Sequence, residues 1–167
     1  MDDPSSLVLR VAGMGAGATL VLDLWLVFLR RALRVATMDF ALLGRWLGHV
    51  PQGRWFHPAG MARAAPVRGE RAWGWLLHYA VGMVFAALLV LWQGPQWLGQ
   101  PTALPALAAG AATVAAPLLV LQPAMGQGLA ARKTAAPWAN RARNLANHTV
   151  FGLGLFLSAR LLAHLFA

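Results

Sequence analysis

Cysteine is absent from the 167 residues of this chain, and acidic side chains number only five. Without thiols the chain cannot form disulfides, thiolate zinc sites or cysteine-ligated iron–sulfur clusters. Charged residues make up 11% of the sequence and hydrophobic residues 59%, whereas soluble domains carry about 25% charged residues. This composition excludes an ordinary soluble domain and indicates a membrane protein.

Recognisable catalytic motifs are absent as well. The sequence contains no Gly-rich phosphate loop, no nucleophile elbow and no HExxH zinc-protease motif. This favours a protein without catalytic activity, although it leaves open whether the chain is an enzyme.

Four apolar stretches have about the 20 residues that a helix needs to cross a bilayer core. They cover residues 7–29, 73–92, 103–121 and 145–166. We therefore predict an all-α fold, a polytopic four-transmembrane-helix bundle that occupies residues 1–167 as a single membrane domain. The residues from 32 to 50 alternate apolar and basic side chains, which fits either a separate interfacial helix or a continuation of the first span.

The basic residues give the orientation. Twelve of the 14 Lys and Arg residues lie in two loops, residues 30–72 and 122–144, and the exceptions are Arg10 and Arg160. By the positive-inside rule both loops are predicted to be cytoplasmic, so the N- and C-termini are periplasmic. Arg10 and Arg160 are expected to snorkel from helix ends. The net charge of +9 follows from this topology, so we expect the lipid bilayer as a partner and no nucleic acid.

An internal repeat is suggested by matching spacings. His78 follows Arg71 by seven residues and precedes Gly82 by four, and His148 has the same spacing to Arg141 and Gly152. The first and third spans likewise share an Ala-Thr pair, at Thr19 and Thr113. We predict a duplicated two-helix hairpin with parallel repeats, related by an axis along the membrane normal.

Polar residues within the spans are the candidate site. Asp23 is the only acidic residue inside a span, and a charge at the centre of a helix is costly unless it has a partner or a wet cavity. The topology places other polar side chains at a similar depth, in the cytoplasmic half of the bundle. The predicted polar or ligand-binding level comprises Asp23, His78, His148, Asn147 and Gln122.

Four interpretations of this level stay open. The polar groups hydrogen-bond across helices and hold the bundle together, or they bind a small solute, ion or proton. In the third, His78 and His148 ligate a b-type haem. In the fourth, Asp23 joins both histidines around a divalent metal. The remaining histidines, His49, His57 and His164, are expected to be solvated or interfacial.

Two further segments contain residues that bend or closely pack helices. Residues 122–128 combine Pro and Gly after the third span, which fits a re-entrant turn or a helix end followed by a basic loop. Gly13 and Gly17 form a GxxxG pair, and Gly15 with Thr19 forms a similar small pair. Such pairs allow close helix packing, within the bundle or in a homodimer.

Several strings resemble a known family. Asp23-Leu24-Trp25, His78-Tyr79 and above all Gln122-Pro123-Ala124-Met125-Gly126 resemble bacterial integral membrane proteins catalogued as domain of unknown function 2938. The resemblance covers nearly the whole chain and implies a bacterial membrane protein, but no activity.

The expected function is therefore broad. We predict an inner-membrane binding protein or accessory subunit, alone, as a homodimer or within a larger membrane complex. The alternative is a small transporter or a haem- or metal-binding protein that uses Asp23, His78 and His148.

Overall fold

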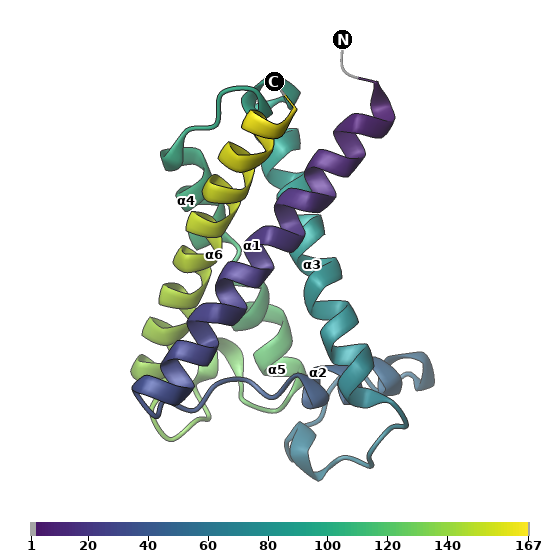
Figure 1. The fold of residues 1–167 in the computed structure, drawn as a ribbon. Helices are drawn as coiled ribbons and strands as arrows, with labels where there is room; N and C mark the ends of the chain where they lie inside the picture. The colour runs from purple at the N-terminus through teal and green to yellow at the C-terminus, as the bar shows by residue number, and fades with distance from the viewer. Residues whose placement is uncertain (1–2, 167) are drawn as a thin grey trace. The chain divides into compact units, whose positions relative to one another are not determined.

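A computed structural model describes residues 3–166, and every regular element within them is helical. Four helices are long and apolar enough to cross a membrane: Pro4–Ala32, Glu70–Gln93, Ala103–Ala124 and Pro137–Leu165. The first, second and fourth are α1, α3 and α6 in Figure 1. The predicted all-α fold with four membrane helices is thus confirmed.

The helices extend beyond the apolar windows seen in the sequence. α6 begins at Pro137, eight residues before the predicted start at 145. Proline suits the first helical position because its missing N–H would have no intrahelical partner there. The first turns of α6 carry Arg141 and Asn144, which a hydropathy window excludes although they continue the same helix.

The third span is present as predicted, but it is not one regular α-helix. α4 (Ala103–Ala112) ends with Thr113 as its C-cap, and a π-helix, η4 (Ala116–Leu121), follows before the short α5 (Gln122–Ala124). Pro117 lies at the start of the π-helix. Because proline lacks an N–H and its ring clashes with the preceding turn, a regular α-helical ladder cannot pass through this position.

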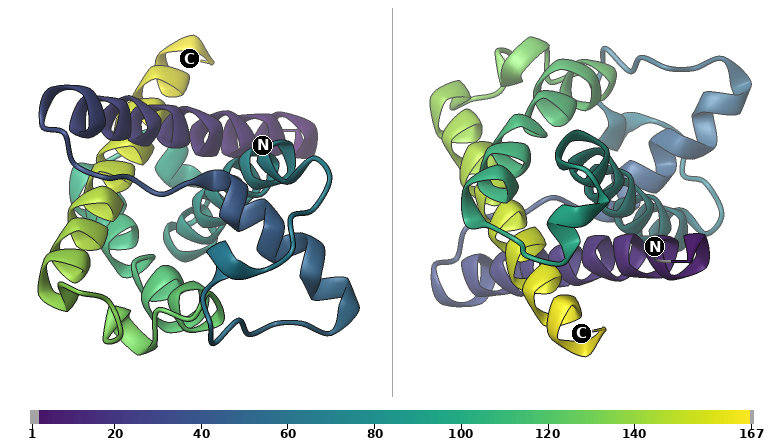
Figure 2. Two further views of the ribbon diagram at one scale, coloured as in Figure 1. Left: turned by 90° about the horizontal axis from the view of Figure 1, so that it is seen from below. Right: turned by 90° about the horizontal axis from the view of Figure 1, so that it is seen from above.

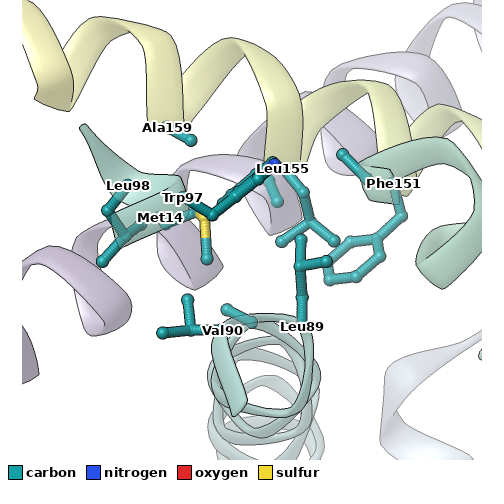
Figure 3. Close-up of a cluster of buried hydrophobic side chains, with 11 residues drawn as sticks. Met14, Leu89, Val90, Trp97, Leu98, Phe151, Leu155 and Ala159 are labelled. Atoms are coloured by element: carbon teal, nitrogen blue, oxygen red, sulfur yellow. The ribbon is translucent and has the colours of Figure 1, made fainter. Parts of the chain in front are cut away.

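The described chain divides into two compact units. The first contains residues 3–36, 79–113 and 146–166, and the second contains residues 37–78 and 114–145. The core of the first unit is drawn in Figure 3, where Leu89, Phe151 and Leu155 lie against one another. Met14 and Leu155 are completely buried, so α1 and α6 both contribute to this core.

Two close helix crossings in the first unit share a pattern. A Cβ atom on Gly15 of α1 would lie 2.5 Å from the Met83 Cα of α3, and one on Gly82 would collide with the Thr19 hydroxyl. At the second crossing, a Cβ on Gly110 of α4 would collide with the backbone of Gly152 in α6. Only glycine permits such backbone approach. Both crossings use the glycine four residues after a predicted-site histidine, at the positions that the predicted duplication aligns. The duplication itself stays a prediction.

Each crossing also includes a threonine that bonds back to its own helix. Thr19 Oγ1 donates to the Gly15 carbonyl at 2.8 Å, and Thr113 Oγ1 donates to the Gly110 carbonyl at 2.6 Å. These are the two threonines that the predicted repeat aligns. The hydroxyls satisfy their donors locally and leave the helix faces free to pack.

The small residues of α1 are used within the chain. Gly17 lies against Ser158, and the backbone at Ala18 lies against Gly154, so α1 crosses α6 on this face (Figures 1 and 2). A Cβ on Gly13 would also meet α6, at Leu162, whereas Gly15 faces α3. Both small-residue pairs predicted from the sequence therefore contribute to packing inside the bundle.

The second unit contains α2 (Phe40–His49), and residues 33–39 before it are not helical. The continuation of the first helix through this segment was therefore the wrong alternative, and a separate helix is observed, shorter than predicted (Figure 2). The Asp39 side chain caps it by accepting from the Ala41 N–H at 2.9 Å, a bond that satisfies one free N–H of the first turn.

α2 packs closely on the start of α3. Gly44 and Gly74 bring the two backbones together, and the Arg45 guanidinium forms two 2.8 Å bonds with the Glu70 carboxylate. This pairing raises the pKa of Arg45, chiefly through its hydrogen bond to Glu70. Leu43, Met61 and Met125 form a small apolar cluster in the same unit.

Short turns complete the described chain. Three lie in the second unit, the 3-10 turns η1 (Val50–Gln52), η2 (Met61–Arg63) and η5 (Leu129–Ala131). One, η3 (Pro95–Leu98), lies in the first unit between α3 and α4. The segment after α5 leaves the helix at Met125 and Gly126, and the Met61 N–H donates to the Met125 carbonyl. Residues 122–128 thus form a helix end followed by a loop.

Candidate functional site

The five residues predicted to form one polar level are divided between the two units. Asp23, Asn147 and His148 belong to the first unit, and His78 and Gln122 belong to the second. Their arrangement as a single site stays a prediction. Each residue has a defined local setting, and these settings decide what chemistry it can support.

Asp23 lies on α1 and is partly buried. The Tyr79 hydroxyl of α3 donates to Asp23 Oδ2 at 3.0 Å. Tyrosine is a neutral donor, so this bond stabilises an ionised carboxylate and is equally compatible with a protonated carboxyl group whose carbonyl oxygen accepts. The pair therefore links two helices whether or not Asp23 carries charge.

Asn147 has a partner on α1, two residues from Asp23. The Trp25 indole N–H donates to Asn147 Oδ1 at 3.0 Å. An indole nitrogen only donates and a buried one needs an acceptor. The bond therefore joins α1 to α6 and gives the partly buried indole N–H an acceptor.

His148 is bonded to the end of α4. Its Nδ1 lies 2.8 Å from Thr113 Oγ1. Because the threonine hydrogen is already donated to the Gly110 carbonyl, His148 Nδ1–H is the donor in this contact. This bond joins α4 to α6.

The three bonds form a connected series. Tyr79–Asp23 links α3 to α1, Trp25–Asn147 links α1 to α6, and Thr113–His148 links α6 to α4. Every helix that contributes to the first unit's bundle is thus tied to another by a bond between side chains. Such bonds contribute about 0.6 kcal/mol each on average between membrane helices.

His78 and Gln122 have different surroundings in the second unit. The His78 ring lies 4.3 Å from the Phe40 ring and 5.8 Å from the Trp75 ring, measured between centroids. Gln122 is 6% exposed, and its Oε1 has no hydrogen-bond partner among the described residues. Within residues 3–166, no three His, Asp or Glu side chains are grouped so that they could hold a metal ion.

Two basic residues have partners that the sequence did not predict. Arg10 is 7% exposed, and its Nη2 donates to the Leu98 carbonyl at 2.7 Å, so its snorkelling stays a prediction. The η3 turn supplies this acceptor, and a hydropathy pattern cannot reveal it. His49 is not solvated, being 4% exposed; its ring pairs with His57 and with the Ala65 carbonyl, both at 3.0 Å.

Sequence analysis missed the partners of the predicted residues. Tyr79 is the only tyrosine in the chain and directly follows His78, a signal that could have drawn attention to it. Trp25 is two residues from Asp23, but tryptophans near span ends are usually interfacial anchors. The pairing of His49 with His57 depends on the turn at Gly53, where φ is 74°, and had no sequence signal.

The comparisons with known proteins match one family. The sequence profile of a family described as "Protein of unknown function (DUF2938)" matches residues 12–162. No curated protein and no solved structure matches the chain.

Proposed function

Because the chain belongs to the family described as protein of unknown function (DUF2938), whose name assigns no activity, we propose its function from the geometry: a non-catalytic binding or accessory protein of the bacterial inner membrane. In this proposal the polar residues within the spans hold the helices together. One observation carries the proposal: three of the predicted residues, Asp23, Asn147 and His148, are each engaged in a bond between side chains of different helices.

The accessory role follows from what remains after these bonds are formed. Outside its helices the chain has only loops, which contain short helical turns and α2 and no separate soluble domain among the described residues. Large apolar side chains remain exposed along the spans, such as Leu24, Leu91 and Leu104, and these suit lipid or the helices of a second membrane protein. A homodimer or a larger complex would use the same surfaces.

A second candidate function is cation or proton binding at Asp23. The specific observation is that one partner of Asp23 is the Tyr79 hydroxyl, a neutral donor, so this bond does not neutralise the carboxyl group when it is ionised. Such a carboxylate in an apolar span attracts a proton or a cation. This function would be a transporter or binding protein rather than an accessory subunit.

The stability of Asp23 variants separates the two candidates. Reversible unfolding in mixed detergent micelles is measured for the wild type, Asp23→Asn and Asp23→Leu, with sodium, potassium and pH varied. If the bond is only structural, the unfolding free energy of Asp23→Asn, which still accepts from Tyr79, should stay within about 0.5 kcal/mol of the wild-type value. Asp23→Leu should lose about 1–2 kcal/mol of unfolding free energy, because the Tyr79 hydroxyl loses this acceptor.

Ion binding predicts a response of the wild type to ions or pH rather than a fixed loss of stability in the variants. Sodium, potassium or a change of pH would then stabilise the wild type in a concentration-dependent way, and Asp23→Asn would remove that response. An Asp23-dependent response would contradict the structural proposal.

The proposed orientation places residues 30–72 and 122–144 in the cytoplasm and both termini in the periplasm. The absence of cysteine makes the test direct, because a single introduced thiol is the only labelling site. Gln100→Cys should react with a membrane-impermeant maleimide in intact spheroplasts. Ala136→Cys should react only after permeabilisation. Labelling of Ala136→Cys in intact spheroplasts would reverse the orientation.

A further inference from the structure

The second unit contains a groove that the proposed function does not use. It has a cavity volume of about 530 Å³ and is lined chiefly by residues 53–57, by His49 and by Ala64 and Ala65. This volume is within the range of small-molecule sites, which is roughly 300–1,000 Å³. None of the lining residues carries a carboxylate, so the charge in the groove is positive.

The groove is built on a pair of imidazoles, of which His49 is buried and His57 is partly buried. His49 Nε2 lies 3.0 Å from the Ala65 carbonyl, which can only accept, so this nitrogen carries the hydrogen. In neutral His49, Nδ1 is then an acceptor, and His57 Nε2–H donates to it at 3.0 Å. The His57 backbone N–H also donates to the Ala124 carbonyl, at 2.8 Å. The floor of the groove is therefore fixed from two segments of the chain.

Arg54 supplies an unpaired cation at this groove. No hydrogen bond or ion pair engages its guanidinium within residues 3–166. Two other arginines of the same unit are engaged: Arg45 binds Glu70 through two bonds, and Arg141 donates to the Ala130 carbonyl and lies over the Trp138 ring. Arg54 differs from the remaining arginines of the unit in that it lines the groove. Arg54 thus retains the donors that a phosphate or carboxylate group needs.

Aromatic side chains lie next to this cation. Trp55 is 52% exposed and Phe56 is 69% exposed, and both line the groove. The Trp55 carbonyl accepts from the Trp46 indole N–H at 3.0 Å, which holds this segment against α2. Large exposed aromatic side chains beside an arginine suit the boundary between lipid headgroups and acyl chains.

From this combination we infer that the groove binds the headgroup of an anionic phospholipid. The Arg54 guanidinium pairs with the phosphate, and Trp55 and Phe56 contact the glycerol and the first methylene groups of the acyl chains. The charge bias of the sequence predicts this segment on the cytoplasmic side, where anionic lipids attract basic residues. The inference does not depend on the role of Asp23.

Binding of phosphatidylglycerol to the purified full-length protein tests the inference. The lipid is titrated in mixed micelles against phosphatidylcholine, and bound lipid is counted by native mass spectrometry. The wild type should prefer phosphatidylglycerol, and Arg54→Gln should weaken that binding about tenfold, the loss expected for one charge-assisted bond. Arg54→Glu should weaken it further.

A matched control comes from the same loop. Arg63→Gln removes the same charge from an exposed position that does not line the groove, and it should leave lipid binding within about twofold, as expected for a screened charge that does not contact the headgroup. Phe56→Ser should weaken lipid binding but not the weak binding of soluble glycerol phosphate. Thermal unfolding of each variant verifies that it is folded.

Three results would overturn the inference. One is equal binding of phosphatidylglycerol and phosphatidylcholine by the wild type. Another is an equal loss in Arg54→Gln and Arg63→Gln, which would show unspecific attraction to the loop. The third is binding of soluble glycerol phosphate as tight as that of the lipid, which would assign the groove to a free phosphate ligand.

Discussion

The crossing of α1 with α3 and the crossing of α4 with α6 have the same glycine-mediated backbone packing but different polar contacts. Both bring glycines into backbone contact, and both place a threonine whose hydroxyl returns to its own helix. At the first crossing Thr19 is buried, and its hydroxyl bonds only to the Gly15 carbonyl among the described residues. At the second crossing the Thr113 hydroxyl also contacts His148.

The two predicted repeats also differ at the positions of the Asp23–Tyr79 pair. Where the first hairpin has Asp23 and Tyr79, the alignment that matches Thr19 with Thr113 and His78 with His148 puts Pro117 and Thr149. Pro117 begins the π-helix of the third span, so the second hairpin has a distorted helix where the first has a carboxylate. This difference teaches that close packing and polar chemistry are separable: glycines bring the backbones together at both crossings, whereas the polar pairs differ between them.

The largest expected losses of stability come from the glycines at the two crossings. Gly15→Ala and Gly110→Ala should each destabilise the protein by about 1–3 kcal/mol, because the added methyl group meets backbone that cannot move away cheaply. Gly13→Ala is the matched control, since its methyl group would lie 3.6 Å from the Leu162 side chain. Detergent unfolding of the three variants measures the effect. A tolerated Gly15→Ala beside a damaging Gly110→Ala would show that the crossings are not equivalent.

The next effect separates the two threonines. Thr113→Val should cost about 1 kcal/mol, because it removes the partner of the His148 N–H. Thr19→Val, which removes only a bond within α1, should be close to neutral. The same unfolding measurement compares them. Equal losses would mean that the contact between Thr113 and His148 contributes nothing beyond the local bond.

The smallest effect concerns the second unit and depends on pH. Burial lowers the pKa of His57, and the charges of His49 and Arg54 lower it further, while the Ala124 backbone opposes them. A lowered pKa in the folded state means that the unfolded chain binds the proton first as the pH falls. Stability should therefore rise with pH up to about 6.5, the ordinary value for histidine. In His57→Gln the unfolding curves from pH 5 to 8 should vary less with pH, and an unchanged slope would assign the effect elsewhere.

Composition and periodicity were sufficient to predict the membrane helices but not the side-chain contacts between them. The long apolar segments at α1, α3 and α6 predicted membrane helices because length and hydropathy are properties of a single segment. The pairs Asp23–Tyr79 and Trp25–Asn147 could not be predicted, since they depend on which helix faces meet. The break at Pro117 had a local signal that the apolar window concealed. The groove at Arg54 depends on a turn and on a histidine pair eight residues apart, neither of which has a periodic pattern.

A double-mutant cycle on Asp23 and Tyr79 tests most directly whether the polar residues within the spans stabilise the bundle by bonding one helix to another. Unfolding free energies are measured for the wild type, Asp23→Val, Tyr79→Phe and the double variant under identical micelle conditions. The account predicts a favourable coupling energy of about 0.6–2 kcal/mol, the range expected for a bond between membrane helices that is partly charge-assisted. Additive losses, with a coupling of zero, would contradict it, because the two side chains would then not stabilise the bundle through each other.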